Sequence, residues 1–353
     1  FMKEWLALYE SKSGERGIFS RVSAQEKAKE NGRRKSDYAF GTNPCSEIIL
    51  RPNQFCNLTE VVCRPTDTVE TLKDKIEVAT ILGTIQATLT NFGYLRKRWK
   101  DNTEEERLLG VSLTGIMDNS ILSRRRTTLP ETLQGMRQKA VLVNKEWSEK
   151  LGIPQSTAIT CVKPSGTVSQ LVDSASGIHA RHNPYYIRTV RGDNKDPLTE
   201  FMKEQGIPCE PDVMNPNHTS VFSFPMKADS NAVFRNDMSA IEQLEIWKCY
   251  AEHWCEHKPS VTISVKEDEW VNVGNWCWDN FSALSGISFL PFSDHTYQQA
   301  PYQDIDEATY EELNSKMPTN INWSDLSKFE KEDTTKGSQE LACTAGSCEL
   351  VDI

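Results

Sequence analysis

The chain has 353 residues, enough for one large domain or two ordinary domains with an ample core. Its hydrophobic content of 38% and charged content of 25% are typical of a soluble globular protein and argue against a disordered or membrane-spanning chain. The net charge of -10 argues against a nucleic-acid surface, but it leaves room for a small anionic substrate. No apolar run approaches the roughly 20 residues that span a bilayer, and no signal peptide is recognisable at the start.

The chain opens at Phe1-Met2-Lys3, inside what the apolar spacing predicts to be a helix. We therefore expect a fragment whose N-terminal part is missing. Ten cysteines at irregular spacing do not resemble a secreted disulfide framework. Most thiols are expected to be reduced and buried, which indicates a cytoplasmic protein.

The stretch from Gly41 to Cys56 carries the first pattern that suggests chemistry. Asn43, Cys45 and Glu47 stand at spacing two, so an extended segment would point all three side chains the same way. The amide can donate or accept a hydrogen bond, and the carboxylate can take a proton. Cys56 follows eleven residues after Cys45, beyond a turn-prone segment. Thiol chemistry on a bound substrate fits these residues, and so does an ordinary strand with a buried cysteine.

Strand-like and helical patterns alternate along the chain, which predicts an α/β fold. Strands are expected at 48–50, 55–62, 158–162, 261–265 and 284–290. One helix follows a capping pair, Asp67 and Glu70, and its buried face is expected to hold Leu72, Ile76, Ala79, Leu82 and Leu89. A second helix is expected to end at Gly152 and to bury Met136, Ala140, Val143, Trp147 and Leu151.

The loop after the strand at 158–162 has the composition of a phosphate site. Its residues are Pro164, Ser165, Gly166, Thr167, Val168 and Ser169. Such residues entering a helix leave backbone N–H groups aimed outward, where they can hold an anion. It is not a Walker loop, because no Gly-Lys-Ser/Thr follows at the required spacing. A second turn lies close behind at 174–179, and a capped turn without a ligand is the alternative interpretation.

A helix predicted over 241–255 places Cys249, His253 and His257 at spacing four, on one face. No Cys-x-x-Cys partner is nearby, so a half-exposed helix explains this pattern better than a zinc site does. We expect no protein-bound metal.

After about Trp323 the composition changes to Ser, Lys, Glu, Asp, Thr and Gly, with few apolar residues. The chain closes with Cys343 and Cys348 separated by small residues. Two such thiols on a mobile tail can close a disulfide and reopen it, and can therefore carry electrons to a buried disulfide. An inert tail is the alternative.

Taken together, four ordered motifs resemble the ribonucleotide reductases. Residues 43–47 with Cys56 look like the active-site finger loop of that family. Residues 163–167 are similar to its substrate-phosphate loop, and 174–179 to the neighbouring turn. The Cys-x-x-x-x-Cys ending resembles the redox tail of the monomeric class II enzymes, which depend on adenosylcobalamin. The runs at 108–116 and 284–290 also look like that branch, and the resemblance covers essentially all 353 residues.

The fold that the resemblance implies is a ten-stranded α/β barrel with the finger loop, here at about 41–56, at its centre. Residues 1–325 would then form the second half of the barrel, and residues 326–353 a flexible tail. The missing N-terminal half would be a partner of this chain, and most allosteric effector sites would lie there.

The resemblance also implies roles for the motif residues. Cys45 would become a thiyl radical that removes the ribose 3′ hydrogen, Glu47 would be the base on the 3′ hydroxyl, and Asn43 would orient the substrate. Cys56 would be one half of the thiol pair that supplies reducing equivalents. Its partner would be a cysteine from the missing half, so this fragment alone is expected to be inactive.

The tail cysteines, Cys343 and Cys348, would reduce the resulting disulfide, and thioredoxin or a similar dithiol would restore them. The implied substrates are ribonucleotides, as triphosphates in the monomeric class II branch, and the implied cofactor is adenosylcobalamin. Class I enzymes have a tyrosine pair for radical transfer where this chain has Phe289-Leu290-Pro291-Phe292. This difference favours the cobalamin route.

Two other functions remain open from the residues. A thiol–disulfide exchange protein would use only Cys56, Cys343 and Cys348. A non-catalytic nucleotide-binding fragment of a split reductase would bind phosphate at 165–169 and turn nothing over.

Overall fold

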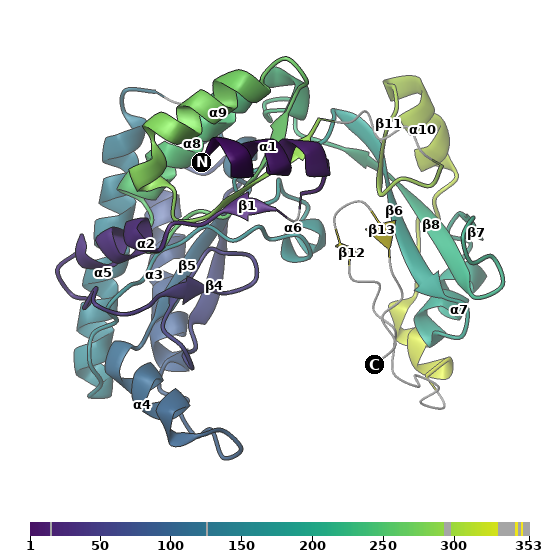
Figure 1. Ribbon diagram of the computed structural model, residues 1–353. Coiled ribbons are helices and arrows are strands. Elements are labelled where there is room, and N and C mark those ends of the chain that lie inside the picture. The colour runs from purple at the N-terminus through teal and green to yellow at the C-terminus, as the bar shows by residue number, and fades with distance from the viewer. Residues whose placement is uncertain (15, 125, 293–297, 331–342, 345–346, 349–353) are drawn as a thin grey trace. The chain divides into compact units, whose positions relative to one another are not determined.

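The computed structural model describes residues 1–330 except 15, 125 and 293–297, together with 343–344 and 347–348 (Figure 1). The chain divides into two compact units. One consists of Phe1–Arg181 and Asn231–Phe292, and the other of His182–Ser230 and Ser293–Ile353.

The first unit alternates strands and helices, which confirms the predicted α/β class. Its strands are β1 (Gly17–Ile18), β2 (Gly41–Thr42), β3 (Ile49–Leu50), β4 (Asn57–Val62), β5 (Leu109–Thr114), β9 (Thr262–Val265) and β10 (Ile287–Pro291). Its helices are α1 (Met2–Ser11), α2 (Arg21–Lys29), α3 (Val69–Gln86), α4 (Lys97–Glu106), α5 (Leu129–Leu151), α6 (Val168–Leu171), α8 (Ala240–His253) and α9 (Trp270–Asp279). Short 3-10 turns lie at Ile116–Asp118, Arg235–Asp237 and Phe281–Ala283.

A parallel row of strands forms the frame of this unit. Strand β4 pairs with β5 in parallel, and β9 pairs with β10 in parallel. Residues 158–162 join the two pairs, because Leu109 N–H donates to the carbonyl of Ala158 at 3.0 Å and Val162 bridges Pro259. The described strands form an open row, so the closed ten-stranded barrel stays a prediction.

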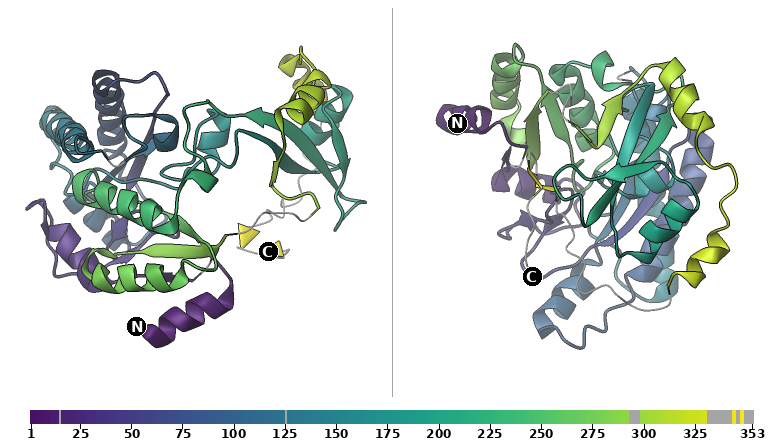
Figure 2. Two further views of the ribbon diagram at one scale, coloured as in Figure 1. Left: turned by 90° about the horizontal axis from the view of Figure 1, so that it is seen from above. Right: turned by 90° about the vertical axis from the view of Figure 1, so that its right-hand side faces the viewer.

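Helix α3 packs against β4 and β5, and α5 lies beside α3 (Figures 1 and 2). Helix α5 ends at Gly152 in the left-handed conformation, as the sequence predicts. Helix α3 begins with a capping box between Thr68 and Thr71 instead of the expected acidic pair. Its expected buried face is wrong at Leu82 and Leu89, which are 57% and 71% exposed.

Helix α8 anchors the strand ends that surround the candidate site. The indole N–H of Trp247 donates to the carbonyl of Pro259 at 2.9 Å, and that of Trp254 to the carbonyl of Cys161 at 2.8 Å. Both rings are fully buried in the main core. Large buried aromatic rings with satisfied N–H groups fix neighbouring backbone well, so the ends of 158–162 and the start of the 259–265 segment are held together.

The second unit is an antiparallel sheet with the strand order β11-β6-β8-β7. Its strands are β6 (Tyr185–Asp193), β7 (Cys209–Pro211), β8 (Thr219–Lys227) and β11 (Tyr302–Asp304). Its helices are α7 (Pro197–Glu204), α10 (Glu307–Ser315) and the 3-10 segment Trp323–Lys328. Two short strands, β12 (Cys343–Thr344) and β13 (Ser347–Cys348), pair with each other. Within the described ranges, none of the helices has the length and apolar character needed to cross a membrane.

Candidate active site

The finger loop is a short hairpin whose tip holds the predicted thiol. Strands β2 and β3 pair antiparallel, with Thr42 opposite Ile49. At the tip, Ser46 N–H donates to the carbonyl of Asn43 at 2.9 Å, and Ile48 N–H donates to the Oδ1 atom of Asn43 at 3.0 Å. This is a tight turn, so the extended segment that we expected at 43–47 is wrong.

The turn leaves the three predicted side chains with different degrees of exposure. Cys45 is exposed, whereas the Glu47 side chain is buried. The Asn43 side chain is half-buried and accepts a bond from the loop itself. The Glu47 Oε2 atom has no hydrogen-bond partner within the described part of the chain, so a buried carboxylate oxygen is left for a ligand.

Electrostatic effects place Cys45, Cys56 and Glu47 in one neighbourhood. Although Cys45 is exposed, its thiol loses part of its hydration to neighbouring groups, and this raises its pKa; the Glu47 carboxylate raises it further, and Lys163 lowers it. Burial also raises the pKa of Cys56, against the effect of Arg34, and Glu47 and Lys163 act on this thiol as well. Both thiols therefore stay protonated at neutral pH.

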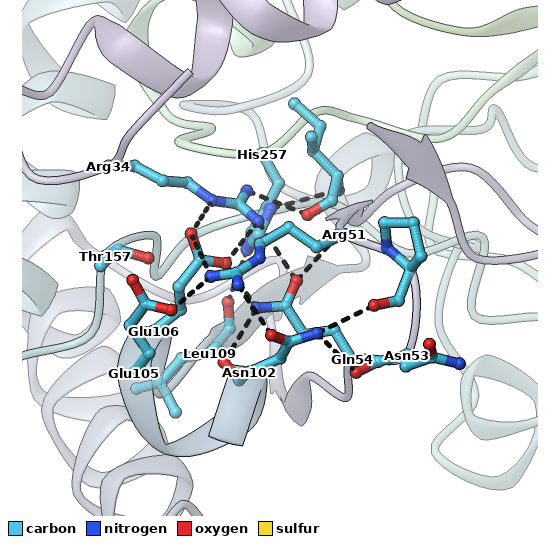
Figure 3. A network of polar contacts seen from close by, with 12 residues as sticks. Arg34, Arg51, Asn53, Gln54, Asn102, Glu105, Glu106, Leu109, Thr157 and His257 are labelled. Atoms are coloured by element: carbon cyan, nitrogen blue, oxygen red, sulfur yellow. Dashed lines mark hydrogen bonds and ion pairs between the residues drawn. The ribbon is translucent and has the colours of Figure 1, made fainter. Parts of the chain in front are cut away.

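A buried polar network supports the base of the finger loop (Figure 3). The Arg34 guanidinium donates to the two carboxylate oxygens of Glu106 at 3.0 and 2.9 Å and to the carbonyl of Ile49 at 2.9 Å. Gln54 joins the network by donating to Glu106 and accepting from the N–H of Arg51. A bidentate, fully buried pair of this kind is directional, so it fixes strand β3 and the approach to Cys56.

His257 holds the same strand from the other side. Its Nδ1 atom accepts a hydrogen bond from Ile49 N–H at 3.3 Å, and its Nε2 atom faces the carbonyl of Leu109 at 3.0 Å. These partners require a neutral ring with the proton on Nε2. Burial is the main cause that lowers the pKa of His257 to about 3, which agrees with this neutral form.

The predicted phosphate loop is folded against the second predicted turn. Ser176 Oγ donates to the carbonyls of Pro164 and Ser165, at 2.7 and 3.0 Å. Gly177 comes so close that a Cβ atom there would lie 2.2 Å from the carbonyl oxygen of Lys163. A left-handed residue, Ser165, then leads the chain into α6.

Three backbone N–H groups of this loop are free for a ligand. The N–H groups of Gly166, Thr167 and Val168 have no acceptor among the described residues, and all three residues are exposed. Ser169 N–H, by contrast, donates to the carbonyl of Ser165 at 3.1 Å. Consecutive free N–H groups form the concave donor set that oxyanions bind.

An ion pair fixes the second turn from behind. The buried Arg181 guanidinium donates to Asp118 at 2.9 Å, and Asp118 accepts a bond of 2.7 Å from Ala175 N–H. Both side chains are buried. The position of the turn at 174–179 is therefore set by a charged pair that the motif itself does not contain.

Comparison with known proteins finds relatives that match most of this chain. No family model matches the chain. The chain is 28% identical over 344 residues to the adenosylcobalamin-dependent ribonucleoside-triphosphate reductase of Lactobacillus leichmannii, covering 88% of this chain and 45% of that protein. It is 28% identical over 348 residues to the Euglena gracilis enzyme of the same name, covering 95% and 46%.

The resemblance to the adenosylcobalamin-dependent ribonucleotide reductases is confirmed. A crystal structure of a B12-dependent, class II ribonucleotide reductase matches the fold with a TM-score of 0.77 at 24% identity, over 93% of this chain and 50% of that one. The alpha subunit of the Actinobacillus ureae class Id reductase matches more distantly, with a TM-score of 0.53 at 14% identity over 83% of this chain and 61% of that one. The chain spans about half the length of the curated class II relatives that it matches.

Sequence reasoning missed one ionisable group, Glu60, close to the reductase motifs. Burial raises the pKa of Glu60 on β4, while Ser165 and Lys163 favour its ionised form. Among the residues that the structure describes, neither the Oε1 atom of Glu60 nor the Oγ atom of Ser165 has a hydrogen-bond partner. A signal was present in the sequence, because Glu60 places a charged side chain within strand β4 between Leu58 and Val61.

The tail cysteines are described only through their backbone. Cys343 lies opposite Cys348 in the antiparallel pairing of β12 with β13. Their thiols lie outside the described part of the structure. Cys249, His253 and His257 do not share one helical face as a zinc site there would need, because α8 ends at His253, before His257. Where the structure describes side chains, no three His, Cys, Asp or Glu groups gather as a metal site.

Proposed function

We propose that this chain carries the radical site of an adenosylcobalamin-dependent reductase that converts ribonucleotides, as triphosphates, to 2′-deoxyribonucleotides. The observation that supports this most is that Cys45 at the tip of the finger loop and Cys56 beyond its base both interact electrostatically with the Glu47 carboxylate. The names of the relatives support the same reaction. Because the chain spans about half their length, the whole activity belongs to a longer assembly.

The ionisation of the two thiols suits hydrogen-atom chemistry. A hydrogen atom can be taken from S–H but not from a thiolate, and the raised pKa values keep both Cys45 and Cys56 protonated at neutral pH. The Cys45 side chain is also exposed, so it fits a radical-generating cofactor that must reach it from outside the loop. When bound, adenosylcobalamin supplies the one-electron chemistry that removes the thiol hydrogen.

Glu47 is suited to act as the base on the 3′ hydroxyl of the ribose. Its carboxylate is buried, and its Oε2 atom has no protein partner within the described residues. A base and a radical that act on neighbouring ribose positions must face the same ring. The electrostatic effect of Glu47 on the Cys45 thiol supports such an arrangement. Asn43 would then orient the substrate from the base of the turn.

Residues 164–169 would hold the substrate phosphates. The free N–H groups of Gly166, Thr167 and Val168 supply donors, and the packing of Ser176 against the loop keeps them aligned. Oriented backbone donors stabilise an anion without any movement on binding. The nucleotide would thus be fixed at its phosphate end, while its ribose reaches Cys45.

Electron supply would involve Cys56 and the tail. Cys56 would form a disulfide with a cysteine outside this chain, and Cys343 with Cys348 would reduce it by exchange. The backbone pairing that places the two tail cysteines opposite each other supports closure of a disulfide between them. Thioredoxin or a similar dithiol would restore the tail.

The test uses this chain joined to the N-terminal region that its relatives carry, here called the joined reductase. With adenosylcobalamin, a ribonucleoside triphosphate and thioredoxin, we expect multiple turnovers. Replacing both tail cysteines, Cys343→Ser and Cys348→Ser, should leave about one turnover and should be bypassed by a small dithiol. Cys209→Ser, which changes an exposed thiol outside the motifs, is the matched control. Failure of the unmodified protein to reduce any ribonucleotide would contradict the proposal.

A further inference from the structure

A buried lysine lies directly beneath the tip of the finger loop. Lys258 is 1% exposed, and its Nζ atom donates to the carbonyl of Gly286 at 2.6 Å and to Ser46 Oγ at 3.2 Å. Its backbone N–H donates to the carbonyl of Glu47 at 3.2 Å. One residue therefore contacts both of the positions that follow Cys45 in the loop.

Ser46 has a backbone conformation that needs such support. Its φ angle is +70°, in the left-handed region that residues with a Cβ atom rarely occupy. The hydroxyl of Ser46 meets Lys258 Nζ at 3.2 Å and Thr42 Oγ1 at 3.3 Å. A strained residue at a functional site persists only when its surroundings hold it in place.

The structure makes room for the lysine at Gly286. A Cβ atom at Gly286 would lie 2.1 Å from Lys258 Nζ and 2.7 Å from Ser46 Oγ. Because the amino group of Lys258 is enclosed, it could not move away from such a Cβ atom. The glycine before β10 is thus matched to the lysine and to the loop tip.

We propose that Lys258 is a positioning residue for the radical site: it holds Ser46 in the left-handed conformation and thereby fixes the direction of the Cys45 thiol relative to Glu47. This inference rests on the proposed function, since only there is Cys45 a reacting group. The thiol and the base flank Ser46 in sequence, so rotation about the Ser46 backbone changes the angle between them.

The electrostatic interaction of Lys258 with Glu47 supports the same role for the lysine. Burial is the main cause that lowers the pKa of Lys258 to about 7, while Glu47 and then Cys255 act to raise it. Charged or neutral, the Nζ atom keeps N–H donors for Gly286 and Ser46. Its positioning contacts therefore do not depend on its protonation state, whereas the attraction to Glu47 does.

The first test measures the reactivity of Cys45 in the chain without cofactor. Iodoacetamide labelling is followed by peptide mass spectrometry, with the exposed Cys209 as an internal reference and the buried Cys161 as a check on folding. In Lys258→Met the ratio of Cys45 to Cys209 labelling should rise about fivefold, because the released tip moves the thiol away from the Glu47 carboxylate, which raises its pKa. Lys266→Met, at an exposed lysine eight residues on, should leave the ratio unchanged.

A second variant separates positioning from general loosening. Glycine adopts positive φ without support, so Ser46→Gly should keep the turn in the absence of the lysine. In the Ser46→Gly background, Lys258→Met should change the labelling ratio by less than about twofold. An equal effect in both backgrounds would overturn the proposal, and so would a ratio in Lys258→Met that matches Lys266→Met. If Lys258→Met exposes Cys161, Gly286→Ala is used instead and should raise the ratio in the same way.

Turnover of the joined reductase gives an independent reading. Lys258→Met should lower kcat about tenfold with KM within about twofold of the unmodified enzyme, because substrate binding is kept and alignment is lost. A change in KM alone would contradict a positioning role. If no variant turns over, including the unmodified protein, the proposed function fails, while the labelling ratios still decide whether Lys258 holds the tip.

Discussion

The hydroxyl of Ser260 donates a hydrogen bond of 2.6 Å to the backbone carbonyl of Cys45. Ser260 is buried, and its own N–H donates to the carbonyl of Val162 at 2.8 Å. The carbonyl of the proposed radical residue is therefore tied to the parallel row of strands. The finger loop is held at successive residues by one short segment, which includes His257, Lys258 and Ser260.

Removing the Ser260 hydroxyl should loosen the loop without disrupting the fold. We expect Ser260→Ala to lower the free energy of unfolding by about 1 kcal/mol, the usual loss for one buried hydrogen bond. Ser264→Ala, on the same segment in β9, is the matched control and should have a smaller effect. Urea unfolding measures the loss of stability in both variants. Equal losses would show that the hydrogen bond to Cys45 adds nothing measurable to the unfolding free energy.

The buried pair beneath the loop should be far more sensitive than an exposed one. Glu106→Gln leaves the enclosed Arg34 charge without its partner, so we expect a loss of about 3 kcal/mol in unfolding free energy. Glu146→Gln breaks an exposed pair with Lys150 and should leave the urea midpoint nearly unchanged. Urea midpoints compare the two variants. Similar midpoints would contradict the prediction, because they would mean that water solvates the Arg34 charge once its partner is neutral.

The neutral histidine predicts a stability that depends on pH. The pKa of His257 is about 3 in the folded chain and near 6.5 when unfolded, so the unfolded chain binds the extra proton between these values. Stability from this group is therefore complete above pH 6.5 and falls as the pH drops toward 3. Its share should be on the order of 5 kcal/mol at most.

His257→Asn removes this titration while an amide can still bond Ile49 and Leu109. The difference in unfolding free energy between the unmodified chain and the variant should shrink as the pH falls from 6.5 to 4. Comparing the two proteins cancels the titration of the carboxylates that they share. A difference that stays constant across this range would contradict a neutral, buried ring.

Two glycines of the phosphate region should respond differently to alanine. Gly177 has a φ of +56°, and its Cβ would collide with the carbonyl of Lys163, so Gly177→Ala should cost about 2 kcal/mol or more. A Cβ at Gly166 meets nothing within 4 Å, so Gly166→Ala should change unfolding by less than about 0.5 kcal/mol. Thermal or urea unfolding decides between them, and the reverse order would mean that the two turns are not packed together.

The helices and motif chemistry could be predicted from sequence because their signals are local. Helix α5 ends at Gly152, which adopts the left-handed cap conformation, and apolar spacing found Met136 and Ala140 in its core, although Leu151 is 37% exposed. The buried side of α3 was harder to predict. Gly83 lets that helix approach Leu109, which turns Leu82 outward, and no local pattern reveals the contact.

The shape of the finger tip could not be predicted from sequence. Alternation of Asn43, Cys45 and Glu47 suggested an extended strand, whereas the turn depends on Ser46 and on a lysine 212 residues away. The chemistry of the motif was therefore readable, but the direction of each side chain was not. Long-range contacts with Lys258 decide that direction.

The most direct test of the account is turnover of Cys45→Ser in the joined reductase, with adenosylcobalamin, a ribonucleoside triphosphate and a small dithiol. A hydroxyl holds its hydrogen too strongly to take part in the proposed step. We predict no detectable deoxyribonucleotide from Cys45→Ser, with full activity in the Cys209→Ser control. Normal turnover by Cys45→Ser would contradict the assignment of the radical site.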